Sequence, residues 1–152
     1  MLLKMEENLF KKTAVFTIDV EDWYHLDYFK NLKIDKSYST LDGLDNFIEI
    51  LDEKKIKGSF FFVGELIEKL KGKIKLLKSN NHEIGIHSFK HVRPVEQSLK
   101  IFELDVLKCI DKLKNVIKFN KIGYRAPCFA IDRERLNILI KLGLKYDASK
   151  IN

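Results

Sequence analysis

The chain has 152 residues, of which 45% are hydrophobic and 33% are charged, and its formal net charge at pH 7 is +6. These proportions are typical of a folded globular domain and exclude a disordered protein. The lysines lie among acidic and apolar residues, without a run of five like charges, so the charge predicts solvated helix faces and no nucleic-acid partner.

Residues 1–12 are expected to form an N-terminal extension ahead of one domain at 13–152. The extension lacks the continuous apolar run of a signal peptide, and no apolar run along the chain is long enough to span a bilayer. Cys109 and Cys128 are too few for a disulfide framework, and Cys109 falls within an apolar helical pattern that predicts a core position. A cytoplasmic location is therefore expected.

Short apolar runs alternate with helical patterns along the domain. The run at 58–63 is apolar throughout, as expected of a strand that is covered on both faces. The second predicted helix is expected to break at Gly72, and His82 is expected on the surface ahead of the third strand. Strands are predicted at 13–19, 58–63, 83–87, 121–124 and 144–147. Helices are predicted at 41–55, 65–79, 95–117 and 132–142.

Strands that alternate with helices in this way predict an α/β fold with a parallel sheet. A finished flavodoxin-like open sheet and the N-terminal portion of a (β/α) barrel both fit the number of units. In either fold the active site lies at the carboxyl ends of the strands, where two histidines and several carboxylates would form a metal site. The polar residues that follow the strands include Asp19, Glu21, Asp22, Glu65, His87, His91, Arg125 and Asp147.

Three constellations among these residues carry the functional argument. In extended backbone Asp19 and Glu21 point the same way, and Asp22 joins them only if the chain turns. His87 and His91, four residues apart, can bind one metal ion if the backbone is turned between them. Arg125, at the end of the fourth predicted strand and shortly before Pro127, can bind a carboxylate through its guanidinium. Taken singly, each pattern is also typical of an ordinary loop.

In this order, the three constellations resemble the motifs of the polysaccharide deacetylase (NodB-like) family. Residues 17–19 with the acids that follow resemble its T-F-D-D motif, 87–91 its H-[ST]-x-x-H motif, and 125–129 its R-x-P-x-F motif. The stretch 19–24 (DVEDWY) is most similar to the branch written D-V-E-D-[YW]-[FY]. The resemblance covers roughly 13–149 and implies the N-terminal portion of a distorted (β/α) barrel.

The resemblance also implies an activity. In this family a divalent metal ion, held by an acid and two histidines, supports hydrolysis of N-acetyl or O-acetyl groups on a polysaccharide. It implies that Asp19 is the general base, that Arg125 keeps Asp19 ionised and oriented, and that the backbone N–H of Cys128 helps to stabilise the oxyanion. Trp23 and Tyr24, with the neighbouring His25, are either the lining of a sugar groove or loop anchors.

The metal is expected to be zinc, with cobalt, nickel or manganese as alternatives, and His87 and His91 are its implied histidine ligands. The family places the acidic ligand directly after the base, but this position is Val20 here. Glu21 and Asp22 both remain candidates, with a slight preference for Asp22 because aspartate is the usual ligand type.

The family's later motifs, an Asp/Trp segment and an L-x-L-H that supplies the general acid, do not follow Asn152, so the chain is expected to be an inactive or poorly folded fragment. Other interpretations stay open. One is hydrolysis of another non-peptide C–N bond in a small amide. A second is an iron oxygenase, which the Arg-x-Pro motif argues against. A third is a non-catalytic protein, either a basic binding module or a metal-binding fragment.

Overall fold

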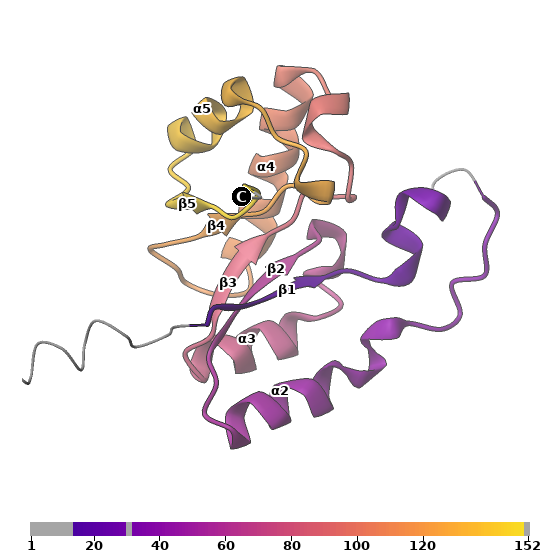
Figure 1. The fold of residues 1–152 in the computed structure, drawn as a ribbon, viewed down its shortest axis with the longest axis vertical. Helices are drawn as coiled ribbons and strands as arrows, with labels where there is room; N and C mark the ends of the chain where they lie inside the picture. The colour runs from indigo at the N-terminus through magenta and orange to yellow at the C-terminus, as the bar shows by residue number, and fades with distance from the viewer. Residues whose placement is uncertain (1–13, 30–31, 151–152) are drawn as a thin grey trace, which may run out of the picture.

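A computed structural model describes residues 14–29 and 32–150, so the expected extension at 1–12 lies outside the described residues. The described chain contains a five-stranded parallel sheet in the order β1-β2-β3-β4-β5 (Figure 1). The strands are β1 Phe16–Val20, β2 Gly58–Phe62, β3 Glu83–Ile86, β4 Gly123–Tyr124 and β5 Tyr146–Asp147.

The strand order separates the two folds that the sequence left open. A flavodoxin-like sheet has the order 2-1-3-4-5, because its chain reverses direction across the sheet. Here every strand pairs with the next one in the chain, always in parallel. Sequential winding is the arrangement of a (β/α) barrel. The prediction of the N-terminal portion of a barrel is therefore confirmed.

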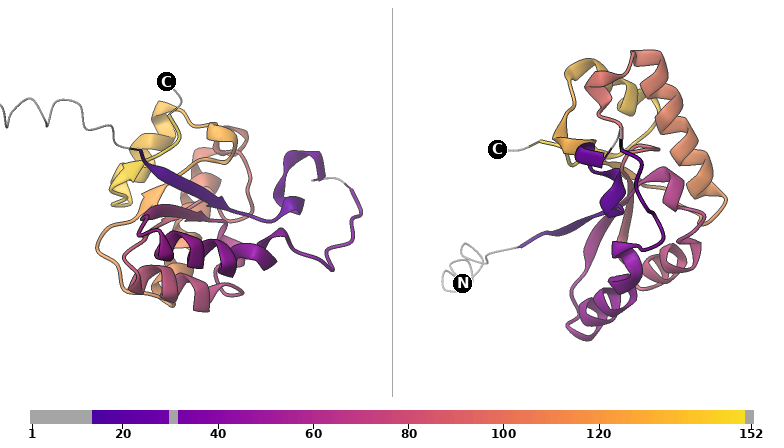
Figure 2. Two further views of the ribbon diagram at one scale, coloured as in Figure 1. Left: turned by 60° about the horizontal axis from the view of Figure 1, so that its bottom comes forward. Right: turned by 90° about the vertical axis from the view of Figure 1, so that its right-hand side faces the viewer.

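The helices are α2 Leu44–Glu53, α3 Lys71–Ser79, α4 Leu99–Lys114 and α5 Arg133–Lys141. Two of them begin at side-chain caps: Ser98 Oγ accepts the amide of Ile101 before α4, and Asp132 Oδ1 accepts the amide of Arg135 before α5. In the right-hand view of Figure 2, α2, α3 and α4 lie on one side of the sheet. No helix among the described residues is long and apolar enough to cross a membrane.

The core lies between the sheet and these helices. Phe60, Phe61 and Phe62 of β2 are fully buried, which confirms the prediction of a strand covered on both faces. Cys109 of α4 is also buried, as predicted. Phe61 points to the face opposite the helices, where the guanidinium of Arg125 lies 4.4 Å from its ring centroid. That face is the one that would line the interior of a barrel.

Two local predictions were wrong. Gly72 does not break a helix, because α3 runs through it and the interruption lies before α3, at 67–70. His82 is buried rather than exposed. Its Nδ1 accepts the amide of Gly58 at 3.2 Å and its Nε2 lies 3.2 Å from Oδ1 of Asp52, so it ties the start of β2 to α2.

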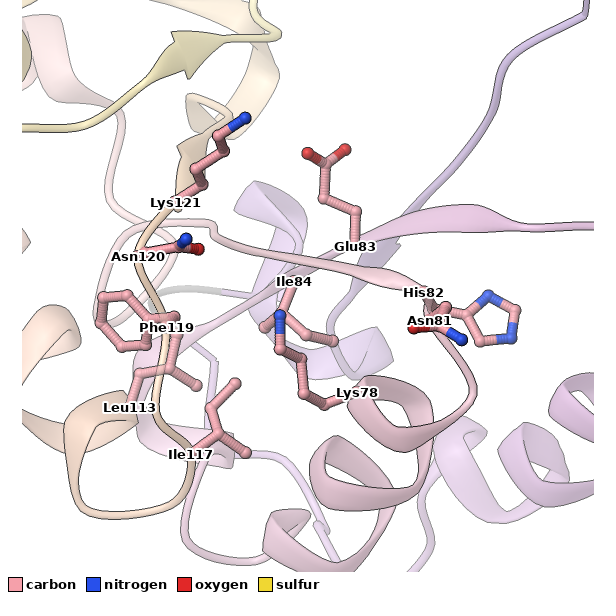
Figure 3. A pocket seen from close by; sticks show the side chains of 10 residues that line it. All are labelled: Lys78, Asn81, His82, Glu83, Ile84, Leu113, Ile117, Phe119, Asn120 and Lys121. Carbon is pink, nitrogen blue, oxygen red and sulfur yellow. The ribbon is translucent and has the colours of Figure 1, made fainter.

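A pocket lies near His82 at the amino ends of β3 and β4 (Figure 3). Its polar lining includes Lys78, Glu83 and Lys121, whose chains extend to the surface. In parallel barrels this end contributes to stability, whereas chemistry takes place at the carboxyl ends of the strands. The carboxyl ends of the strands, at the opposite end of the sheet, are therefore where a catalytic site is expected.

Candidate active site

The end of β1 delivers two carboxylates to the carboxyl edge of the sheet. Asp19 lies in β1 beside Phe61 of β2, and the chain continues past Val20 to Glu21. The alternation of side chains in extended backbone brings both carboxylates to the same side. Oδ2 of Asp19 lies 4.0 Å from Nε2 of His87, and Oε2 of Glu21 lies 2.7 Å from Nε2 of His91. The two acids thus meet both histidines.

Asp22 turns away into the loop that follows β1. It is buried, and its carboxylate accepts hydrogen bonds from Ser39 Oγ, from the Thr40 amide and hydroxyl, and from the Trp23 amide. Burial alone would raise the pKa of Asp22, but the hydrogen bonds to its carboxylate outweigh burial, so the pKa is lower than its usual value. An ionised carboxylate with this many donors fixes the path of the loop, which Figure 1 shows extending beyond the end of β1.

The end of β3 delivers the two histidines. His87 directly follows β3. A tight turn leads from His87 to His91, and its residues Ser88 and His91 have positive φ angles of 61° and 56°. Non-glycine residues adopt this conformation at a cost, which is common at functional sites. Nδ1 of His87 donates to the carbonyl of Arg125 at 2.8 Å, so its Nε2 is left to face the carboxylates.

Arg125 follows β4 and clamps Asp19. Its Nη1 donates to Oδ1 of Asp19 at 2.9 Å, its Nη2 to Oγ1 of Thr17 at 3.0 Å, and its Nε to the carbonyl of Ala148 at 3.1 Å. The guanidinium is only slightly exposed. A cation held in this way orients a neighbouring carboxylate.

Glu21, His87 and His91 together form a group of donor atoms that could hold a metal ion, because one ligand atom from each lies within 4.8 Å of the others. Asp22 does not belong to this group. Oε2 of Glu21 and Nδ1 of His91 are buried without a hydrogen-bond partner among the described residues. Two imidazoles and one carboxylate are a donor set that suits zinc and related ions.

The electrostatics of this group suit a neutral His87 and an ionised Glu21. Burial lowers the pKa of His87, which favours the neutral imidazole that binds metals. Burial raises the pKa of Glu21, but the contact with His91 and the charges of the neighbouring histidines outweigh it and lower the pKa overall. Both shifts favour the protonation states that a metal ligand needs.

The remaining predicted residues lie in the segments that follow β1 and β4. Trp23 stacks on Tyr38, with ring centroids 5.0 Å apart, and its indole N–H donates to the Tyr38 carbonyl at 3.3 Å. Tyr24 lies edge-on to Trp23. Cys128 is exposed, has a φ of 53°, and its thiol lies 3.7 Å from a carboxylate oxygen of Asp27. The aromatic pair therefore anchors its own loop, whatever further contacts it makes.

Sequence reasoning assigned no role to several side chains that hold the site together. Ser39 and Thr40 both donate to the carboxylate of Asp22. Asp105 of α4 accepts the amide of Phe89, between the two histidines, at 2.9 Å. Glu65 was noted at a strand end, and it contacts Nε2 of His25 at 2.9 Å. Position at a strand end was the one available signal, and only Glu65 carried it.

The fold and the site define a protein of the parallel β/α class with a carboxylate–histidine cluster at the carboxyl ends of its strands. The sequence profile of the polysaccharide deacetylase family matches residues 30–146. The chain belongs to this family.

Two curated relatives are also described as deacetylase or deacetylase-like proteins. The chain is 26% identical over 107 residues to a peptidoglycan deacetylase of Helicobacter pylori. This alignment covers 70% of this chain and 36% of the relative. It is 28% identical over 115 residues to a peptidoglycan deacetylase-like protein of Gibberella zeae, which covers 70% of this chain and 32% of the relative. The chain thus spans about a third of the length of these relatives.

Solved structures share the fold. A polysaccharide deacetylase structure from Mycobacterium smegmatis superposes with a TM-score of 0.64 at 27% identity, over 70% of this chain and 37% of that one. A carbohydrate esterase family 4 pseudoenzyme from Bacillus anthracis superposes with a TM-score of 0.72 at 19% identity, over 91% of this chain and 43% of that one. The second likeness bears on the fold alone.

Proposed function

We propose that this chain carries the metal-binding and base-bearing part of a hydrolase that removes N-acetyl or O-acetyl groups from a polysaccharide. The observation that carries the proposal is the placement of Glu21, His87 and His91 within 4.8 Å, beside a carboxylate that Arg125 clamps. One curated relative is described as a peptidoglycan deacetylase and the other as a peptidoglycan deacetylase-like protein, which makes acetylated peptidoglycan the first substrate to test.

The metal ligands in this proposal are Glu21, His87 and His91. Glu21 takes the acidic position because its Oε2 lies 2.7 Å from Nε2 of His91, another proposed ligand, whereas four hydrogen bonds from outside the cluster already occupy Asp22. This reverses the slight sequence-based preference for Asp22. Zinc is the first choice for two imidazoles and a carboxylate, with cobalt, nickel and manganese as alternatives.

When bound, such an ion would acidify a water molecule and polarise the acetyl carbonyl. Asp19 would then accept the proton of the attacking water, since its Oδ2 faces the cluster while its Oδ1 is held by Arg125. The amide of Cys128, in the loop after Arg125, is the proposed donor to the oxyanion. Trp23 and Tyr24 are proposed to border the sugar groove.

The test is acetate release from acetylated peptidoglycan fragments and from chito-oligosaccharides, with and without added zinc. The proposal predicts release that depends on zinc and is lost in Asp19→Asn and His87→Ala. Turnover of small amides without turnover of either sugar polymer would favour the alternative C–N hydrolase. Zinc binding without acetate release would favour the alternative of a non-catalytic metal-binding fragment.

A further inference from the structure

Glu65 lies between the two segments that carry the proposed metal ligands. Its backbone amide donates to the carbonyl of Phe89 at 3.0 Å, and the amide of Gly64 donates to the carbonyl of Ser88 at 2.8 Å. Both acceptors lie between His87 and His91. The turn after β2 is therefore fastened to the backbone of the histidine segment.

The packing at this junction is tight. A methyl group on Gly64 would lie 2.6 Å from the ring of Phe89 and 2.7 Å from the sulfur of Cys109, which is closer than real contacts allow. The turn that presents Glu65 therefore has little freedom to shift relative to the histidine segment.

The side chain of Glu65 reaches the other segment through His25. Its Oε1 lies 2.9 Å from Nε2 of His25, which is buried. Nδ1 of His25 accepts the amide of Asp22 at 2.8 Å, so Nε2 carries the ring hydrogen and donates to the carboxylate. Asp22 directly follows Glu21. A continuous set of hydrogen bonds thus runs from the histidine segment through Glu65 and His25 to the residue beside Glu21.

We propose that Glu65 and His25 are a positioning pair that sets Glu21 against His87 and His91. The inference rests on the proposed metal centre and adds to it. Two separate loops supply the three donor atoms, and an ion needs them at fixed separations. Partners that hydrogen-bond a metal ligand directly change metal affinity by about 10–100-fold when they are lost, and Glu65 and His25 act one residue further away, through the backbone amide of Asp22.

The experiment measures zinc affinity of the full chain by competition with a chromophoric chelator. Glu65→Ala is expected to weaken zinc binding by about 10-fold, the lower end of the range for direct partners of a ligand. Glu65→Gln keeps an oxygen that accepts from Nε2 of His25, so it is expected to retain most of the affinity. The matched control is Glu68→Ala, which removes an exposed acid of the same segment whose partner is Lys71. Zinc affinity of the control should equal that of the wild type.

A second measurement separates positioning from general loss of structure. His25→Gln and the double variant with Glu65→Ala should each lose about as much affinity as Glu65→Ala alone, since the two residues act through one contact. The absorption spectrum of bound cobalt should change in these variants and not in the control. Thermal unfolding without metal reports folding, and if Glu65→Ala does not fold, His25→Gln and Glu65→Gln provide the comparison.

The outcomes are distinct for the two proposals. Failure of the wild-type chain to bind zinc or cobalt would overturn the proposed metal centre and the pair with it. Wild-type binding that His87→Ala abolishes, with unchanged affinity and cobalt spectrum in folded Glu65→Ala and His25→Gln, would overturn the pair and leave the centre standing.

Discussion

Arg125 and Asp19 are 106 residues apart in the chain, and a 2.9 Å hydrogen bond joins Nη1 of the one to Oδ1 of the other. Four further contacts hold the same guanidinium: Oγ1 of Thr17, the carbonyl of Ala148 and the rings of Phe61 and Phe129. One side chain therefore connects β1, β2 and the segment after β5. The clamp that would orient a catalytic base is also a tie across the sheet.

Arg125→Ala is expected to destabilise the chain because it removes this tie and leaves Asp19 without its cation. Asp19 is partly exposed, so we expect a loss of about 1–3 kcal/mol rather than the larger cost of a fully buried orphaned charge. Urea-induced unfolding measures it. Lys141→Ala, which removes an exposed partner of Glu103, is the control and should change stability by less than about 0.5 kcal/mol. Equal effects of the two variants would contradict the prediction.

The strand-end residues could be predicted from the sequence because the fold class fixes where they go. Asp19, His87 and Arg125 lie at or just beyond the carboxyl end of a parallel strand. The ends of parallel strands meet at one edge of the sheet, so these residues can be placed together without knowing any side-chain contact. The local pattern at 58–63 likewise predicted a strand buried on both faces. These inferences needed only periodicity and strand direction.

Other features depend on partners distant in the chain. Whether Asp22 joins the cluster depends on Ser39 and Thr40, which lie 17 and 18 residues later and bind its carboxylate. The burial of His82 depends on Asp52, thirty residues earlier. No local pattern distinguishes such an anchored residue from an exposed one. The burial of His82 was therefore not predicted, and the choice between Glu21 and Asp22 stayed open.

The choice between Glu21 and Asp22 can be tested by metal affinity and stability together. Loss of a direct ligand should cost more than the loss of a neighbouring partner, so Glu21→Gln is expected to weaken zinc binding by more than about 100-fold. Asp22→Asn should keep zinc affinity within about 10-fold but lose about 1–2 kcal/mol of stability, because an amide accepts weaker hydrogen bonds than a carboxylate. Calorimetric zinc titration and urea unfolding of both variants provide the measurements, and the reverse pattern would restore Asp22 as the ligand.

Asp105 provides a pH-dependent prediction. Burial raises its pKa in the folded state, although the amide of Phe89 opposes the shift. The protonated Asp105 therefore stabilises the fold most at a pH below the pKa of the unfolded chain, about 3.9. This stabilisation is lost as the pH rises through the higher pKa of the folded state. Asp105→Asn keeps an acceptor for Phe89 without the buried charge. It should unfold at higher urea concentration than the wild type at pH 7, and this advantage should shrink towards pH 3.5.

The control for this comparison is Asp111→Asn in the same helix, where the carboxylate is exposed and 4.0 Å from Lys114. It should show little difference from the wild type at either pH. An Asp105→Asn variant that is less stable than the wild type by the same amount at both pH values would show that the hydrogen bond, and not burial of the charge, dominates at this position.

Gly123 and Tyr146 face each other across the β4–β5 pair, and a methyl group on Gly123 would lie 2.0 Å from the Tyr146 ring. The ring has little room to withdraw because it packs edge-on against Phe61, 6.2 Å away between centroids. Gly123→Ala is therefore expected to cost about 1–3 kcal/mol through overpacking. In a Tyr146→Ala background the same substitution should cost much less, since the clashing ring is gone. A double-mutant cycle by urea unfolding measures the coupling, and additive effects would show that Tyr146 is not what keeps position 123 a glycine.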